Sequence, residues 1–157
     1  MLSLFFRNLF FTILQPGIVA GIVPFWILGN RFGIAFTPSL QFYQYPAILL
    51  FVAGVFILFD CIIRFAVEVR GTLSPADPTK KIVVKGLYRF SRNPMYIGVT
   101  MILTGEALFF YSFNIFIYLL LVFSAFNLFI ILFEEPRLRK DFNADYSEYF
   151  KNVRRWI

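Results

Sequence analysis

The chain of 157 residues is 59% hydrophobic and only 15% charged, with a mean hydropathy of +0.73 and a net charge of +6. Soluble domains carry about 25% charged residues, so this composition excludes a soluble globular protein and a disordered one. The absence of histidine and the presence of a single cysteine, Cys61, exclude a histidine-dependent triad, a histidine metal site, an intrachain disulfide and a thiolate metal cluster.

Four apolar stretches are long enough, or nearly so, to cross a bilayer, which takes about 20 helical residues. They cover residues 9–28, 45–65, 95–111 and 115–133. Pro16 and Pro24 predict a kink in the first stretch. The third and fourth stretches are so close in sequence that they are expected to form a tight antiparallel hairpin. The predicted fold class is an all-α integral membrane protein with about four transmembrane helices, in one membrane domain over residues 1–157.

Two segments outside these spans hold most of the polar residues, the loop 66–94 and the tail 134–153. The loop begins with a turn-rich run, and a long irregular loop in so small a protein is usually functional. The tail is expected to be helical because its apolar residues recur at helical spacing. These residues are Leu138, Phe142, Tyr146, Tyr149 and Phe150. We interpret the tail as an amphipathic cytoplasmic helix that lies on the membrane or folds over the loop.

The basic residues indicate the orientation of the chain. With a cytoplasmic N-terminus, fourteen of the fifteen Lys and Arg residues lie on the cytoplasmic side, and Arg31 alone lies outside. The positive-inside rule therefore favours cytoplasmic N- and C-termini. Orientation and contact with anionic lipid headgroups also account for the positive net charge, so a nucleic-acid partner is not needed.

The densest polar cluster covers residues 86–98, where the loop enters the third span. Pro94 favours an extended Asn93 and suits the first position of a helix. The N-terminus of that helix offers backbone N–H groups to an anionic ligand, and Arg92 lies beside it. The alternative interpretation is an interfacial belt of Tyr, Phe and Arg, which many membrane proteins have.

A second cluster begins with two adjacent carboxylates, Glu134 and Glu135, at the cytoplasmic end of the fourth span. Such a pair can bind a cation or the hydroxyl groups of a ligand. The alternative is a solvated start of the tail helix, where acidic side chains complement the helix dipole. The residue types alone leave both interpretations open.

Together the two clusters resemble the isoprenylcysteine carboxyl methyltransferase family of integral membrane proteins, with its bacterial members and the related phospholipid methyltransferases. The first block of matching residues is Gly86, Tyr88, Arg92, Asn93, Pro94, Tyr96 and Gly98. The second block is Glu134, Glu135, Leu138, Phe142, Tyr146 and Tyr149. Both blocks occur in the family's order around a helical hairpin, and the resemblance covers residues 73–156.

The chain departs from the family pattern at three positions. Asn93 stands where the eukaryotic members carry His, Asn143 replaces a Gly, and Arg154 replaces a Pro. Asn at the first of these positions is common among bacterial members. The resemblance therefore indicates a bacterial-type protein, and we expect it in a bacterial inner membrane.

The resemblance implies transfer of a methyl group from S-adenosylmethionine to a lipid-like or membrane-embedded acceptor, at a carboxylate, amine or thiol. The implied cofactor-binding residues are Gly86, Tyr88, Arg92, Asn93, Pro94, Tyr96, Gly98, Glu134, Glu135 and Leu138. The candidate catalytic residues are Arg92, Glu135 and, on the fourth span, Asn127. Methyl transfer to a carboxylate or thiolate needs positioning rather than a general base, so the missing histidine is no obstacle. No metal is expected.

Ionisable residues within the spans form a further group of candidates. Glu106 lies deep in the third span, where a carboxyl group is a functional-site hypothesis by default, and we take it as a candidate substrate-binding residue. The alternative is a protonated Glu106 that holds the hairpin together, with Ser124 or Asn127 as its partner. Asp60 and Arg64 are four residues apart on the second span and are expected to pair.

Two other functions are weighed against a methyltransferase. Membrane sterol-type reductases, which use NADPH, share a similar C-terminal architecture but carry a Lys-Tyr-Gly-x-x-Trp pattern in place of Glu-Glu-x-x-Leu. A non-enzymatic lipid-binding subunit would need neither block of residues. Binding of S-adenosylmethionine, of NADPH or of neither distinguishes the three.

Overall fold

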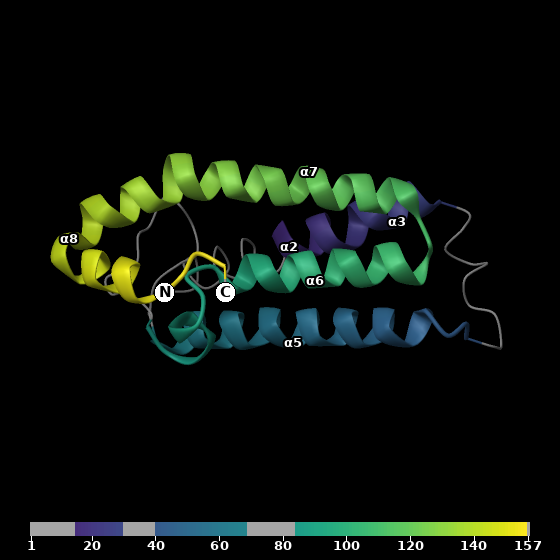
Figure 1. Ribbon diagram of the computed structural model, residues 1–157, viewed down its shortest axis with the longest axis horizontal. Coiled ribbons are helices and arrows are strands. Elements are labelled where there is room, and N and C mark those ends of the chain that lie inside the picture. The colour runs from purple at the N-terminus through teal and green to yellow at the C-terminus, as the bar shows by residue number, and fades with distance from the viewer. Residues whose placement is uncertain (1–14, 30–39, 69–83, 157) are drawn as a thin grey trace, which may run out of the picture.

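The computed structural model describes residues 15–29, 40–68 and 84–156, and this part of the chain contains helices and no strand (Figure 1). The elements are α2 (Gln15–Gly17), η2 (Ile18–Ile22), α3 (Val23–Leu28), α5 (Gln44–Glu68), η3 (Gly86–Arg89), α6 (Pro94–Phe109), α7 (Phe113–Phe129), η4 (Ile130–Glu134) and α8 (Glu135–Asn152). The start of the first predicted span and most of the loop 66–94 lie outside the described residues, as does Arg31.

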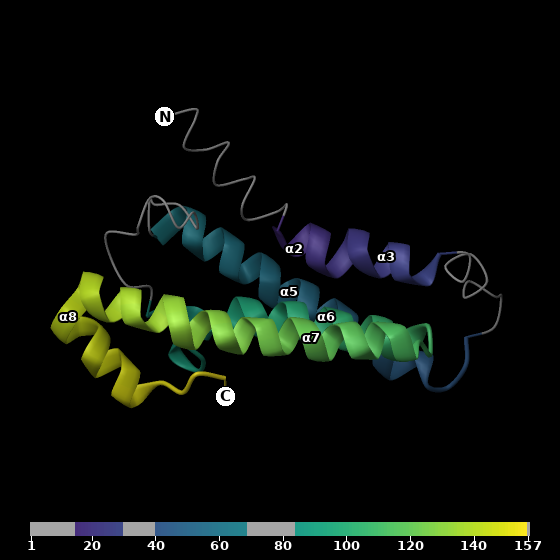
Figure 2. The same cartoon turned by 90° about the horizontal axis from the view of Figure 1, so that it is seen from above.

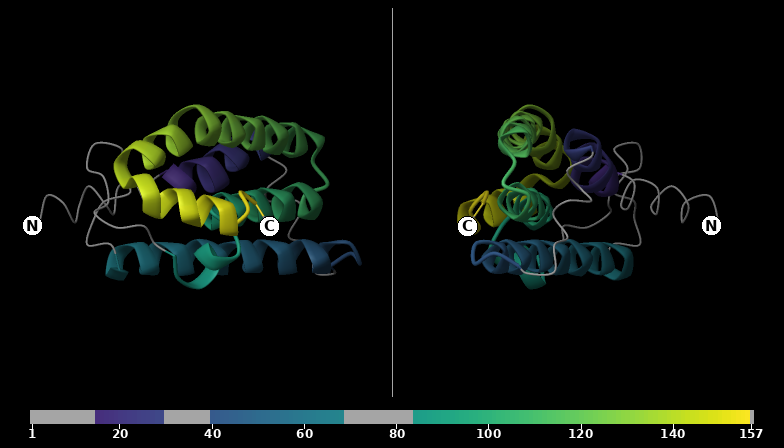
Figure 3. Two further views of the ribbon diagram at one scale, coloured as in Figure 1. Left: turned by 60° about the vertical axis from the view of Figure 1, so that its left-hand side comes forward. Right: turned by 90° about the vertical axis from the view of Figure 1, so that its right-hand side faces the viewer.

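The helix α6 lies between α5 and α7, as the end-on view in Figure 3 shows. The continuous N-terminal helix formed by α2, η2 and α3 packs against α6 and α7, on the side opposite α8 (Figure 2). At the far end of α7 the chain continues through η4 into α8 and turns back, which brings the C-terminal segment beside the start of α6 (Figure 1).

Small residues spaced seven apart let α5 and α6 approach closely. On α5 these are Ala47, Gly54 and Cys61, all of them buried, and on α6 they are Gly98 and Gly105. A Cβ on Gly54 would lie 2.6 Å from the carbonyl oxygen of Gly98, and one on Gly105 would lie 2.8 Å from that of Ala47. Side chains this small at helix interfaces allow the backbones to touch, as is common in membrane proteins.

The kink expected from proline in the first span takes the form of a π-helical turn. Val23 donates its backbone N–H to the carbonyl oxygen of Ile18, five residues earlier. In this register the next donor would be Pro24, which has no N–H to give to the carbonyl of Val19. The hydroxyl of Tyr118 on α7 donates to that carbonyl at 3.0 Å. The proline thus creates an acceptor that ties the first helix to α7.

The predicted hairpin is present between α6 and α7. Tyr111 adopts a positive φ of 46°, and Ser112 caps α7 by accepting a hydrogen bond from the backbone of Ile115. The backbone N–H of Ser112 donates back to Ala107 at 3.0 Å. These contacts close the connection in three residues, so α6 and α7 run antiparallel.

Two helices in the described part of the chain are long and apolar enough to cross a membrane, Gln44–Arg64 and Phe113–Phe142. Both are lined by large apolar side chains that the fold leaves exposed, such as Phe56 (74%) and Leu121 (64%). Exposed apolar surface of this extent is typical of a face that contacts lipid. The helices Ile18–Leu28 and Pro94–Phe109 are apolar but shorter, and the count of four spans stays a prediction.

Candidate functional site

The segment that leads into α6 is shaped by local hydrogen bonds and by Pro94. Gly86 opens the η3 turn with a φ of 61°, and Pro94 occupies the first turn of α6. Asn93 precedes the helix in a non-helical conformation, and its backbone N–H donates to the Ser91 hydroxyl at 3.1 Å. The side chains of Ser91 and Asn93 are buried in this turn. The segment therefore has a defined shape at the N-terminus of α6.

The C-terminal segment closes over this turn. The backbone N–H of Arg92 donates to the carbonyl oxygen of Arg154 at 2.9 Å. The carbonyl oxygen of Arg155 accepts from the Ser91 hydroxyl and from the Asn93 side-chain amide, each at 3.1 Å. Residues more than sixty apart in sequence are thus joined by main-chain and side-chain bonds, and Asn93 is used to hold the tail.

A buried carboxylate links the two predicted blocks. Arg155 makes a two-pronged contact with Glu135, from Nε to Oε1 at 2.9 Å and from Nη2 to Oε2 at 3.0 Å. Arg92 approaches the same carboxylate, with Nη1 3.2 Å from Oε1, and the side chains of Arg92 and Glu135 are each only 10% exposed. Glu135 therefore lies between two guanidinium groups, which satisfies both of its oxygens.

The neighbouring carboxylate, Glu134, has a different environment. It accepts a hydrogen bond from the hydroxyl of Tyr96 at 3.0 Å, from the first turns of α6. The ring of Tyr96 in turn packs against Phe126 on α7, with ring centroids 4.6 Å apart. Tyr96 and Glu134 thus face each other across the α6–α7 hairpin, and no arginine contact to Glu134 occurs among the described residues.

Aromatic side chains from α8 cover the arginine side of this cluster. The guanidinium of Arg92 lies over the Phe150 ring, 3.9 Å from its centroid. Tyr149 donates its hydroxyl to the carbonyl oxygen of Tyr88 at 2.7 Å. Burial raises the pKa of Tyr149 to about 12, partly offset by the charge of Arg92, so the hydroxyl stays protonated and remains a donor at neutral pH. Two residues of the predicted apolar stripe of α8, Tyr149 and Phe150, thus contact the segment before α6.

The contacts of Arg92 with Glu135 and Phe150 do not use all of the N–H groups of its guanidinium. Its Nε and Nη1 atoms are buried and have no hydrogen-bond partner among the described residues, so the 3.2 Å approach of Nη1 to Glu135 is an ion-pair contact without an N–H aimed at the carboxylate. Buried donors without an acceptor cost free energy, and sites that keep them usually bind a ligand or water. An anionic ligand group is the partner that such a guanidinium favours.

The remaining predicted residues are distributed over three places. Gly98 lies at the contact of α5 with α6, where a Cβ would lie 3.0 Å from the Gly54 carbonyl oxygen. Asn127 accepts from the Trp156 indole at 3.2 Å and donates to the carbonyl of Phe123 on its own helix. Leu138 packs in the aromatic cluster of α8. For these residues the contacts indicate packing or positioning roles.

Glu106 lies apart from the cluster. It is ten residues beyond Tyr96 on α6, which corresponds to about 15 Å at 1.5 Å per residue. Its Oε2 atom is buried and has no hydrogen-bond partner in the described part of the chain, so the predicted bonds to Ser124 or Asn127 are absent.

Asp60 and Arg64 do pair as expected, at 2.7 Å from Oδ2 to Nε.

Sequence reasoning missed Ser91, Arg155 and Trp156 as members of the site. Ser91 stands within the first block, two residues before Asn93. A serine hydroxyl often accepts a hydrogen bond from the backbone N–H two residues later, so this spacing was a signal for Ser91 in the sequence. Arg155 and Trp156 lie in the last residues of the chain, where no periodicity or spacing pointed to them. Their roles depend on contacts that form only when α8 turns back.

The chain was compared with known protein families, curated proteins and solved structures. The profile of the phospholipid methyltransferase family matches residues 42–145, which include α5, α6, α7 and both carboxylates of the site. No curated protein and no solved structure matches the chain. Among the described residues, no group of three His, Cys, Asp or Glu side chains is placed to hold a metal ion.

Proposed function

The chain belongs to the phospholipid methyltransferase family, a family of membrane methyltransferases, and we propose that it transfers a methyl group from S-adenosylmethionine to a lipid-like acceptor within the membrane. The observation that carries the proposal is the pair of buried donors of Arg92 that have no partner among the described residues, beside Glu135 and the Phe150 ring. The assignment to the isoprenylcysteine carboxyl methyltransferase branch is part of the proposal and rests on the two blocks of matching residues.

The described residues fit this cofactor by their chemistry. S-adenosylmethionine carries a carboxylate, an ammonium group, ribose hydroxyls and a purine, and it supplies an electrophilic methyl group on a sulfonium. Arg92 would hold the carboxylate through its Nε and Nη1 donors. Glu134 would accept from the ammonium or a hydroxyl, since its contact is a neutral tyrosine. Aromatic faces such as that of Phe126 suit the purine.

Glu135 has a positioning role in this scheme. Both of its oxygens are already bonded by Arg155, and it also holds Arg92 in place. Asn127 positions the tail in the same way, through the indole of Trp156. The tail thereby lies against residues 91–93, where it would help to exclude water, and a dry site makes a nucleophile more reactive toward a sulfonium. The chain's contribution to the transfer is orientation and exclusion of water.

The proposal includes the placement of the protein in the membrane. We propose that the site lies on the cytoplasmic side of a bacterial inner membrane. In the predicted topology, fourteen of the fifteen Lys and Arg residues are on the same side as the site, and the polar cofactor is cytoplasmic. The acceptor then enters sideways from the bilayer. Glu106, a half-buried residue in the apolar part of α6 whose Oε2 atom is buried, remains our candidate for a contact with the acceptor. A C-terminal reporter that is active only outside the cell would contradict this orientation.

Family membership does not favour the two alternatives, an NADPH-dependent reductase and a non-enzymatic lipid-binding subunit. The test is calorimetric titration of the purified chain in nanodiscs with S-adenosylmethionine and, separately, with NADPH. We expect saturable binding of the first alone. Binding of NADPH would support a reductase, and binding of neither compound would overturn the proposed function.

The same titration on an Arg92→Gln variant tests the observation that carries the proposal. Loss of charge-assisted hydrogen bonds worth about 1.5–3 kcal/mol weakens binding by roughly 10–150-fold. The matched control is Arg139→Gln, because Arg139 also lies over the Phe150 ring, 4.5 Å from its centroid, but is exposed. Equal effects of the two substitutions would show that Arg92 acts only by packing on that ring.

A further inference from the structure

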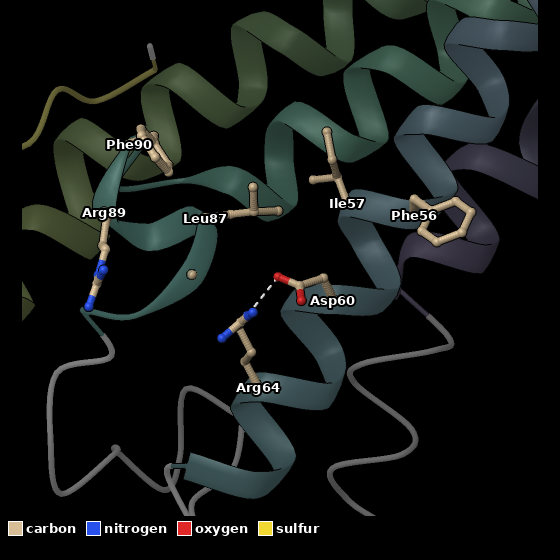
Figure 4. Close-up of a pocket in the computed structure, with 8 residues that line it drawn as sticks. Phe56, Ile57, Asp60, Arg64, Leu87, Arg89 and Phe90 are labelled. Carbon is tan, nitrogen blue, oxygen red and sulfur yellow. Dashed lines mark hydrogen bonds and ion pairs between the residues drawn. The ribbon is translucent and has the colours of Figure 1, made fainter.

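An open groove of about 530 Å³ lies between α5 and the η3 turn (Figure 4). It is formed by the same 86–90 segment that leads into the candidate cofactor site, but neither Arg92 nor Glu135 lines it. The groove is therefore a separate feature, and the proposed function uses none of the charged side chains that line it.

One end of the groove is charged. Arg64 and Arg89 line it together with Asp60, whose Oδ2 accepts a hydrogen bond from Arg64 Nε at 2.7 Å. Among the described residues that line the groove, guanidinium groups outnumber carboxylates by two to one. The side chains of Arg64 and Asp60 are about one-third exposed, at 34% and 37%, so a ligand can reach them.

The backbone of the η3 turn is shaped around Arg64. Gly86 has a positive φ of 61°, and a Cβ at this position would overlap the guanidinium of Arg64. Only glycine allows both the turn and the close approach of that side chain. The position of Arg64 at the groove is thus built into the fold, and Gly86, which is also a predicted cofactor-binding residue, lines the groove.

The other end of the groove is apolar and faces outward. Ile57 and Leu87 form part of its wall, and Phe56 is 74% exposed. Figure 4 shows Phe56 and Ile57 nearer the N-terminal end of α5 than Asp60 and Arg64, and Phe90 beside Arg89 on the η3 turn. Because α5 is apolar and long enough to cross a membrane, this end borders the lipid. The groove thus has a cationic end and an apolar end, the layout of an anionic amphiphile.

We propose that this groove binds one anionic phospholipid, with its phosphodiester between Arg64 and Arg89 and an acyl chain along Phe56 and Ile57. A phosphodiester carries one negative charge, which suits an end of the groove where the described lining has two guanidinium groups and one carboxylate. Guanidinium groups also match the geometry of phosphate oxygens. Inorganic phosphate would leave the apolar wall without a partner, and a zwitterionic headgroup has no net charge to complement.

The experiment uses the full chain in detergent and counts bound lipid by native mass spectrometry during titration with phosphatidylglycerol. We expect one lipid to be retained at least tenfold more tightly than phosphatidylcholine with the same acyl chains, since the phosphate gains charge-assisted bonds. Equal retention of the two lipids would overturn the proposal. Displacement of phosphatidylglycerol by millimolar inorganic phosphate would also overturn it and indicate a plain anion site.

The variant that tests the cationic end is Arg89→Gln, with Arg139→Gln as the control because Arg139 is exposed and does not line the groove. We expect Arg89→Gln to reduce retention of phosphatidylglycerol about tenfold and Arg139→Gln to leave it unchanged. Titration of Arg89→Gln with S-adenosylmethionine shows that the variant is folded and separates this site from the cofactor site. Equal lipid retention by both variants would contradict the assignment of Arg89.

Discussion

The indole of Trp156, one residue from the end of the chain, donates a hydrogen bond to the side-chain oxygen of Asn127 at 3.2 Å. Its ring also packs on Phe123, with centroids 5.0 Å apart. The last residues of the protein are thereby attached to α7, and the carbonyls of the tail reach the loop before α6. We therefore expect the tail, which contacts both α7 and the segment before α6, to close the proposed cofactor site.

Removal of the indole hydrogen bond tests this closure. Trp156→Phe keeps an aromatic ring against Phe123 but leaves Asn127 without its donor, a loss of about 1 kcal/mol. We expect S-adenosylmethionine affinity, measured by calorimetry, to fall about fivefold. Trp26→Phe is the matched control, since Trp26 is 78% exposed and lies outside the site. A deletion of residues 142–157 should abolish binding altogether, and unchanged binding after that deletion would show that the tail is only a membrane anchor.

The two adjacent carboxylates are expected to respond differently to the same substitution. Glu135→Gln removes the charge between Arg92 and Arg155 and should lower the free energy of unfolding by about 1.5–3 kcal/mol. Glu134→Gln retains an oxygen for the Tyr96 hydroxyl, so its stability should change little while cofactor affinity falls about tenfold or more. Thermal unfolding in detergent and calorimetric titration measure the two effects. The reverse pattern would assign the cofactor contact to Glu135.

Glu106→Gln is expected to separate the cofactor from the acceptor. Since Glu106 lies about 15 Å along α6 from Tyr96, the substitution should leave S-adenosylmethionine affinity within about threefold. If the carboxyl contacts the acceptor, turnover or its pH dependence changes instead. Loss of cofactor binding in Glu106→Gln, with binding retained in Glu134→Gln and Glu135→Gln, would require the site to be moved to the middle of the hairpin.

The α5–α6 contact predicts a strong effect of a single methyl group. Gly54→Ala places a Cβ 2.6 Å from the backbone oxygen of Gly98, so the helices must separate, at a cost of about 1–3 kcal/mol. Gly21→Ala is the control, because a Cβ there meets no atom within 4 Å. Chemical unfolding in detergent should show a loss of stability for the first variant only. Equal stability of the Gly54→Ala and Gly21→Ala variants would mean that α5 and α6 are not in close contact.

Much of the architecture follows from local sequence properties. Apolar stretches, proline positions and the short connection after the third stretch indicated the helices and the α6–α7 hairpin, because these features act within a few residues. Heptad-spaced small residues such as Gly54 and Gly98 were also visible in the sequence, but their spacing does not say which helix faces which. Gly98 was predicted as a cofactor contact from the family resemblance, and the structure adds that it packs on α5.

The sequence by itself determined the membrane class, the hairpin and the two blocks of residues that mark the family, since composition, periodicity and spacing are local properties. Only the tertiary structure decided that Glu134 bonds to Tyr96 whereas Glu135 bonds to arginine. It alone also showed that Arg155 and Trp156 contact the predicted site residues. These relationships depend on α8 turning back over the loop. Contacts between residues so distant in sequence arise from the packing of whole helices, which no local pattern encodes.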